Sequence, residues 1–200
     1  MNFLILISTL VFFCLKSTYS DITAEQQTAI LDAHNNYRAL VASGNETGQP
    51  KAANMLKMKW NSESASKAQI IANKCTNTNF SMADMKYGTF ERVGSNIFKF
   101  KRDNFVGIEN YWHYESLKYD FSSKTCSGFS PCLGYTQVVW ADSQEIGCGA
   151  FYCETKSPKV NYVVCIYGPE GNLPGLSPYI SGTTCSQCPS GTTCINSLCS

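Results

Sequence analysis

Apolar positions along the first part of the chain recur at helical spacing. Thr23 is followed three residues later by Gln26, and this capping-box pattern predicts that a helix begins there. The residues of its inward face follow one another at spacings of four, three and four: Ile30, His34, Tyr37 and Val41. Because His34 falls among core positions, we expect it to be buried and hydrogen-bonded rather than catalytic.

A second helix is predicted to begin near Asn61, after a loop over residues 43–53 that is rich in Gly, Asn and Pro. Trp60, directly before it, is expected to pack as an anchor. One face of this helix carries small residues: Ala65, Ala68, Ala72 and Cys75. Small side chains there would allow the helix to approach a sheet closely.

A third helix is predicted to follow Asp103, a residue type that favours helix N-caps. Its apolar face includes one carboxylate: Phe105, Ile108, Trp112, Glu115 and Tyr119. A carboxylate among aromatic residues needs hydrogen-bond partners or a raised pKa, so we expect Glu115 to join a polar network or to line a cavity. His113 lies off this face and is interpreted as a surface residue.

Three segments are predicted as strands: residues 91–100, with a turn or bulge at Gly94, and residues 144–153 and 160–167. A short helical stretch around residues 136–140 precedes the last two. Helices flank the strands on both sides in the sequence. This order predicts an α+β fold, a three-layer α-β-α sandwich.

The N-terminal residues 1–20 are predicted to be a secretory signal peptide, with an apolar core and small residues, Ser17 and Ser20, near its end. The apolar run is shorter than the about 18 residues that a spanning helix needs, so we expect no integral membrane segment in the mature chain. The protein is therefore expected to be secreted and extracellular. Sequons at Asn45 and Asn79 fit export and are candidate glycosylation sites.

Cysteine content and charge narrow the function classes. Ten of the eleven cysteines remain once the segment with Cys14 is removed, and an even number in an exported chain indicates five disulfides. The 16 basic and 15 acidic residues nearly balance. Without a basic surface, nucleic acid and anionic membrane are not expected as partners.

Residues 174–200 form a distinct tail after a domain at residues 21–173. Proline and glycine mark a linker, and four cysteines then follow within fifteen residues: Cys185, Cys188, Cys194 and Cys199. The tail has almost no apolar content of its own, so we expect disulfides to hold it. In an exported protein this reading is favoured over a zinc or redox site at Cys185-x-x-Cys188.

Two segments carry a family resemblance. Residues 132–140, Cys-Leu-Gly-Tyr-Thr-Gln-Val-Val-Trp, resemble the Gly-His-Tyr-Thr-Gln-Val-Val-Trp signature of the CAP superfamily of cysteine-rich secretory proteins, antigen 5 and pathogenesis-related protein 1. Residues 162–173 are similar to a second signature of that superfamily, and residues 34–38 resemble its His-Asn-x-x-Arg element. The cysteine spacing is most similar to that of nematode venom-allergen-like proteins with a single CAP domain and a hinge-like tail.

The resemblance implies both the sandwich architecture and a disulfide pairing. The implied pairs are Cys75–Cys153, Cys148–Cys165, Cys126–Cys132, Cys185–Cys194 and Cys188–Cys199. Cysteine spacing alone leaves many pairings open.

The central cleft of the family commonly holds two histidines and two glutamates, a set that suits a divalent metal. The matching positions here are Phe80, Ser95, Glu115 and Gly134. Only Glu115 keeps a ligand, so we expect no metal and no cofactor. A serine nucleophile needs a base within hydrogen-bond reach, and the cleft histidines are absent, so we expect no catalytic residue and no enzyme activity.

Two regions are candidates for binding lipid. Residues 119–132 resemble, imperfectly, the aromatic loop through which several family members bind sterols, and Tyr119, Phe121 and Phe129 are its candidate contacts. Inward packing of these rings is the equal alternative. The second region is a groove between the first and third helices, where some relatives hold a fatty acid, with Leu40, Val106 and Leu117 as candidate lining.

These observations favour a secreted, non-enzymatic protein that binds sterol, fatty acid or another lipid at a host or extracellular interface. The alternative is an immunomodulatory effector that engages an extracellular protein receptor through its surface loops. In that case the domain would be a catalytically inert scaffold.

Overall fold

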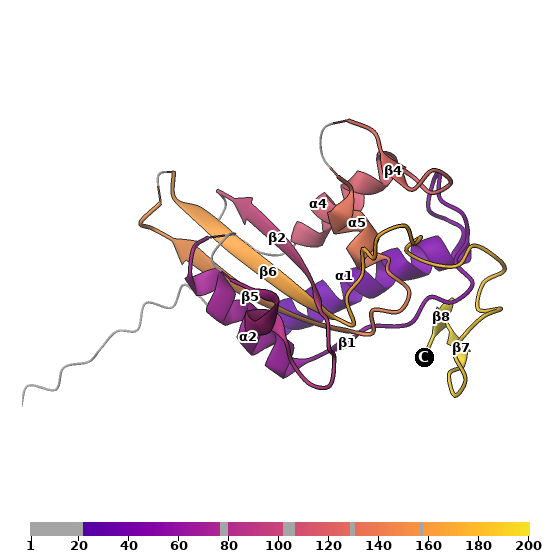
Figure 1. Ribbon diagram of the computed structural model, residues 1–200, viewed down its shortest axis with the longest axis horizontal. Helices are drawn as coiled ribbons and strands as arrows, with labels where there is room; N and C mark the ends of the chain where they lie inside the picture. Colours follow the sequence, from indigo (N-terminus) through magenta and orange to yellow (C-terminus); the bar gives the residue numbers. More distant parts are fainter. Residues whose placement is uncertain (1–21, 77–79, 102–106, 129–130, 157) are drawn as a thin grey trace, which may run out of the picture.

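A four-stranded sheet forms the middle layer of the protein (Figure 1). The computed structural model describes residues 22–76, 80–101, 107–128, 131–156 and 158–200. The strands lie in the order β1 (Lys59–Trp60), β5 (Glu145–Cys153), β6 (Val160–Gly168) and β2 (Gly94–Phe100). Only β1 and β5 run parallel. Helices cover both faces, which confirms the predicted α-β-α sandwich.

One face of the sheet is covered by α2 (Ser62–Asn73), and the short α3 (Met82–Met85) lies beside it. The helix and β5 approach very closely. A Cβ at Gly147 would lie 2.2 Å from the backbone nitrogen of Ala65, and one at Gly149 would lie 2.3 Å from that of Gln69. The glycines of β5 and the small residues of α2 therefore both allow this close approach. The sequence predicted it from the small side chains on one face of the helix.

The opposite face is covered by α1 (Ala24–Ser43), α4 (Ile108–His113) and α5 (Leu133–Val138). The capping box at Thr23 is present as predicted. Strand alternation in β6 divides the core, because Val163 and Cys165 pack on the α1 side and Val164 and Ile166 on the α2 side.

The third predicted helix is shorter and changes type. It begins at Ile108, after Gly107 as N-cap, and from Tyr114 to Leu117 it continues as the 3₁₀ helix η1. Asp103, Phe105 and Val106 lie outside the described residues. Because 3₁₀ geometry has fewer residues per turn, Glu115 leaves the buried face that contains Ile108 and Trp112 and is only half-buried.

The guanidinium of Arg38, fully buried in α1, joins four parts of the chain. Its nitrogens donate to the carbonyl oxygens of five residues at 2.6 to 3.0 Å: Leu56, Val138, Trp140, Ala141 and Ser143. A buried charge is tolerated only when its donors are satisfied, and here the acceptors are backbone carbonyls. The interaction fixes the end of α5 and the segment before β5 against α1.

The structure contains the five disulfides that the resemblance implied: Cys75–Cys153, Cys126–Cys132, Cys148–Cys165, Cys185–Cys194 and Cys188–Cys199. They join every cysteine of the described residues, so the Cys185-x-x-Cys188 motif offers no free thiolate there.

The tail is held by more than disulfides, contrary to expectation. The backbone N–H of Cys199 donates to Met55 (2.8 Å), and its carbonyl accepts from Lys57 (2.9 Å). Tyr179 is buried in the main core, with its hydroxyl donating to the carbonyl of Pro50 (3.0 Å). Burial and backbone pairing with residues 50–57 therefore anchor the segment that composition alone suggested was a linker.

Two small hairpins complete the structure: β3 (Tyr119–Asp120) with β4 (Thr125–Cys126), and β7 (Cys194–Ile195) with β8 (Leu198–Cys199). Within the described ranges, every helix is too short or too polar to cross a membrane.

The substitution Arg38→Lys is expected to lower the free energy of unfolding by about 3 kcal/mol, because a single ammonium cannot satisfy five buried carbonyls. Urea unfolding of the oxidised protein measures the loss. Arg92→Lys is the control, since Arg92 is an exposed residue and its replacement should change stability by less than about 0.5 kcal/mol. Equal losses for the two variants would show that the guanidinium does not organise the fold.

Candidate functional site

Two of the four cleft positions, Glu115 and Gly134, lie directly against each other. Glu115 Oε2 accepts a hydrogen bond from the backbone N–H of Tyr135 at 2.9 Å. A Cβ at position 134 would lie 2.7 Å from Cδ1 of Trp112 and 2.9 Å from Oε2 of Glu115. With these neighbours in place the site admits only glycine, so the space that a histidine would need is already filled.

The other two positions, Phe80 and Ser95, belong to the opposite face of the sheet. Strand β2 pairs with β6 without interruption, so its side chains alternate between faces. Asn96 donates to the Gly134 carbonyl at 3.0 Å on the α5 side, whereas Ile97 packs with Phe80 on the α2 side. Ser95 shares the face of Ile97. The sheet therefore separates the four positions that the resemblance would gather in one cleft.

Glu115 is both hydrogen-bonded and at the wall of a cavity, the two environments that its sequence position suggested. Burial raises the pKa of its carboxyl, and hydrogen bonds from the backbone of Tyr135 and Gly134 oppose that rise. The cavity has a volume of about 450 Å³. We call it the Glu115 cavity, and its lining is Phe98, Asn110, Tyr111, Tyr114, Glu115, Lys118 and Cys126.

A buried hydrogen-bond chain connects α1 to this site. His34 Nδ1 donates to the Ile30 carbonyl (2.7 Å), and its Nε2 accepts from the Tyr167 hydroxyl (3.0 Å). Asn96 donates to the same hydroxyl at 3.3 Å, as well as to Gly134. Burial lowers the pKa of His34 to about 4, so its imidazole is neutral, in agreement with its predicted structural role.

Sequence patterns did not reveal the roles of Asn96 and Tyr167 in this chain of hydrogen bonds. In the sequence, each residue looks like an ordinary strand position. Their hydrogen-bond partners lie in elements that are distant in the sequence. The alternation of β2 could have placed Asn96 toward α5, but only with the strand register known.

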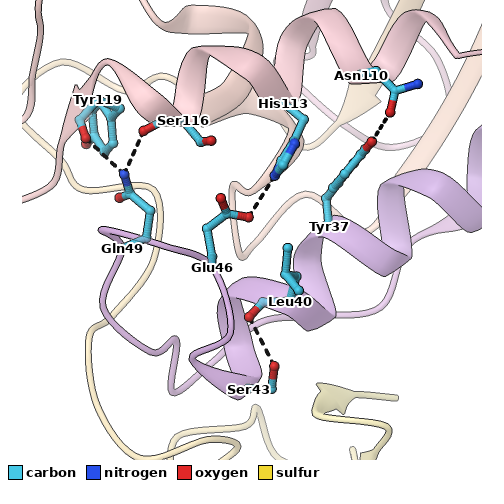
Figure 2. Close-up of polar contacts among 9 residues, drawn as sticks. All are labelled: Tyr37, Leu40, Ser43, Glu46, Gln49, Asn110, His113, Ser116 and Tyr119. Carbon is cyan, nitrogen blue, oxygen red and sulfur yellow. Dashed lines mark hydrogen bonds and ion pairs between the residues drawn. The ribbon is translucent and has the colours of Figure 1, made fainter.

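His113 is not the surface residue that was predicted. Its Nε2 donates to Oε2 of the buried Glu46 at 2.7 Å, and its ring stacks on Tyr37 with centroids 3.9 Å apart (Figure 2). The loop after α1 covers this side of α4, which the periodicity of α4 alone could not show. The chain has only two histidines, and both are therefore engaged in structural hydrogen bonds.

Polar contacts join α1 and its following loop to α4 and η1, where the sequence offered a fatty-acid groove as a second candidate site. Tyr37 donates its hydroxyl proton to Asn110, and Gln49 Nε2 donates to the carbonyls of Ser116 (3.0 Å) and Tyr119 (2.9 Å) (Figure 2). Leu117, one of the candidate lining residues, is 63% exposed. The contacts of Figure 2 do not favour an apolar channel at this place.

The aromatic loop packs inward through the two rings that the structure describes. Tyr119 is buried, with its ring centroid 5.9 Å from that of Tyr135. Phe121 packs on Tyr179 at 4.7 Å between centroids. Phe129 and the sequon residue Asn79 lie outside the described residues.

A larger cavity, of about 750 Å³, lies between this loop and residues 172–178. We call it the loop cavity. Its lining includes Tyr119, Leu133, Trp140 and Leu176, and the two leucines are 53% and 57% exposed. Because apolar side chains line it and remain accessible, this cavity can accept an apolar molecule.

Hydrogen bonds between the two signature segments, residues 132–140 and 162–173, stabilise the wall of the loop cavity. Thr136 donates to Oδ1 of Asn172 (2.6 Å), whose Nδ2 donates to the Leu133 carbonyl (3.0 Å). Gln137 accepts from the backbone N–H of Gly171 (3.0 Å). These bonds hold residues 171–172 against α5 and preform the wall.

Comparison with known proteins agrees with this architecture. Residues 31–167 match the model of the CAP family, described as the cysteine-rich secretory protein family. Peptidase inhibitor 16 of Mus musculus is 38% identical over 185 residues, which cover 89% of this chain. The chain spans only 34% to 42% of the length of the Peptidase inhibitor 16 proteins of Mus musculus, Homo sapiens and Bos taurus.

Solved structures of similar fold include Schistosoma mansoni venom allergen-like protein 4, with 32% identity, a TM-score of 0.69 and coverage of 80% of this chain and 97% of that one. The structure of NaASP2 with Zn²⁺ is 26% identical with a TM-score of 0.68, covering 90% of this chain and 97% of that one. The family match over most of the chain, supported by these likenesses, shows that the chain belongs to the CAP family of cysteine-rich secretory proteins.

Proposed function

We propose that this CAP protein is a secreted, non-enzymatic binder of a sterol or another lipid, held in the loop cavity. The observation that carries the proposal is the volume of about 750 Å³ with Leu133 and Leu176 half-exposed on its wall. Small-molecule sites commonly have volumes of about 300–1,000 Å³, apolar walls and a few polar groups. Tyr119 and Asn172 supply polar groups here.

The proposed contacts differ from a simple insertion of loop aromatics into lipid. Tyr119 contributes to the wall of the loop cavity, while Phe121 supports the neighbouring Tyr179. A ligand in this position would cover the two exposed leucines, and removing apolar surface from water favours binding.

Non-enzymatic function is supported by the state of the two histidines. Each bonds to a structural partner, so neither is available as a base for Ser95. The metal set of the family is not formed either. A side chain at position 134 would require Trp112 and Glu115 to move, and Glu115 is the one carboxylate among the described residues that line its cavity.

Secretion is supported by the family, by the five disulfides and by the predicted signal peptide at residues 1–20. The side chain of Asn45 is exposed in the loop after α1, so a glycan there would point to solvent. A receptor-binding effector remains the competing function, and the next experiment separates the two.

The double substitution of Leu133→Ser with Leu176→Ser is expected to weaken binding of a fluorescent sterol by at least about ten-fold, because the variant loses two apolar contacts. Fluorescence titration measures the affinity. Ile70→Ser is the matched control, since Ile70 is 58% exposed but lies on α2, across the sheet. Equal sterol affinity in all three proteins would refute the loop-cavity site, and a wild type that does not bind sterol at all would favour the receptor-binding alternative.

Zinc is expected to bind no tighter than the high-micromolar range, because one carboxylate without a histidine cannot supply a tetrahedral ligand set. Isothermal titration with Zn²⁺ tests this in the wild type and in Glu115→Gln. A low-micromolar affinity that disappears in Glu115→Gln would show that a metal site exists at Glu115 after all.

A further inference from the structure

The Glu115 cavity is distinct from the loop cavity and carries a different chemistry. The two share only Cys126 among their lining residues. The larger cavity is bounded by residues 119–136 and 172–178, with leucines on its wall, whereas the smaller one is bounded mainly by β2, α4 and η1. Its occupant can therefore be argued independently of the proposed lipid site.

Aromatic rings form much of the wall. Phe98 on β2 stacks on Tyr111 of α4, with centroids 4.5 Å apart and planes at 26°. Tyr111 is 53% exposed and Tyr114, three residues later, is 68% exposed, so two large ring surfaces on one side of the helical segment face solvent or the cavity. Aromatic ring faces are electronegative and attract cations.

Among the described residues that line this cavity, Glu115 alone carries a carboxylate. Its Oε2 is fixed by the Tyr135 N–H at 2.9 Å, which orients the group. Burial works against its ionised form, since the pKa is raised. A cation within the cavity would restore the electrostatic stabilisation that burial removes.

Within the described part of the lining, Lys118 is the one basic side chain, and it does not act as the cation that stabilises the Glu115 carboxylate. It is exposed, and its attraction on the Glu115 carboxyl is the weakest of the influences on that group. A solvated lysine on a flexible stem can move aside at little cost.

We propose that the Glu115 cavity binds a small organic cation, an ammonium group of the choline or alkylamine class, between the exposed tyrosines and the Glu115 carboxylate. Aromatic walls with an acidic group are the arrangement that recognises quaternary ammonium ions. An anionic ligand would meet the negative field of Glu115. A bare metal ion would find a single carboxylate among the described lining residues.

Choline is the probe for the test, and 3,3-dimethylbutan-1-ol, of the same shape without the charge, is its neutral control. Titration followed by NMR is expected to give an affinity for choline at least about ten-fold tighter than for the alcohol. Glu115→Gln keeps an acceptor for the Tyr135 N–H and should weaken choline binding by about ten-fold. Lys118→Ala should tighten it, because a competing cation is removed.

Two further variants separate this site from the lipid site. Tyr111→Leu should weaken choline binding several-fold and leave sterol binding unchanged, and Leu176→Ser should do the reverse. The proposal is overturned if the alcohol binds as well as choline, if Glu115→Gln binds choline like the wild type, or if Lys118→Ala weakens choline binding. Folding of each variant is checked by its thermal unfolding midpoint.

Discussion

The buried guanidinium of Arg38 is the interaction on which the arrangement of the helical layer depends. Its donors hold carbonyls at Leu56, at the end of α5 and in the segment that leads into β5. Leaving such a charge unsatisfied inside a protein would be costly, so these segments must converge on α1 together. This convergence also places the first turn of α5 beside η1, where the backbone of Tyr135 meets Glu115.

The same packing explains why the cleft that commonly holds a metal-binding set in the family lacks that set in this chain. Glu115 and Trp112 occupy the volume beside Gly134, so the position that carries a histidine elsewhere in the family cannot hold one without rearrangement. The carboxylate instead caps the start of α5 and borders an aromatic cavity. The loop cavity, which Cys126 and Cys132 also line, is the site of the proposed lipid. The proposed ligand recognition would take place at these two cavities.

The features that the sequence predicted well are local or periodic. The capping box at Thr23, the small face of α2 and the buried His34 depend on spacings of three and four, which the printed sequence shows directly. The sequence likewise predicted that Glu115 joins a polar network or lines a cavity, and the structure shows both. The prediction that His113 lies on the surface was wrong because its partner, Glu46, is 67 positions away in the loop after α1. Arg38 donates to carbonyls 18 to 105 positions away in the sequence. Every residue has a backbone carbonyl, so the pattern of side chains could not predict which ones Arg38 binds.

Mass spectrometry of the molecules extracted from the purified, secreted wild-type protein tests the central claim most directly. The account predicts a sterol or another lipid in near-stoichiometric amount, because the loop cavity exposes apolar side chains that a ligand would cover. A protein secreted and purified without any bound lipid, and unable to take up sterol afterwards, would contradict the account and leave the CAP domain as a scaffold for protein contacts.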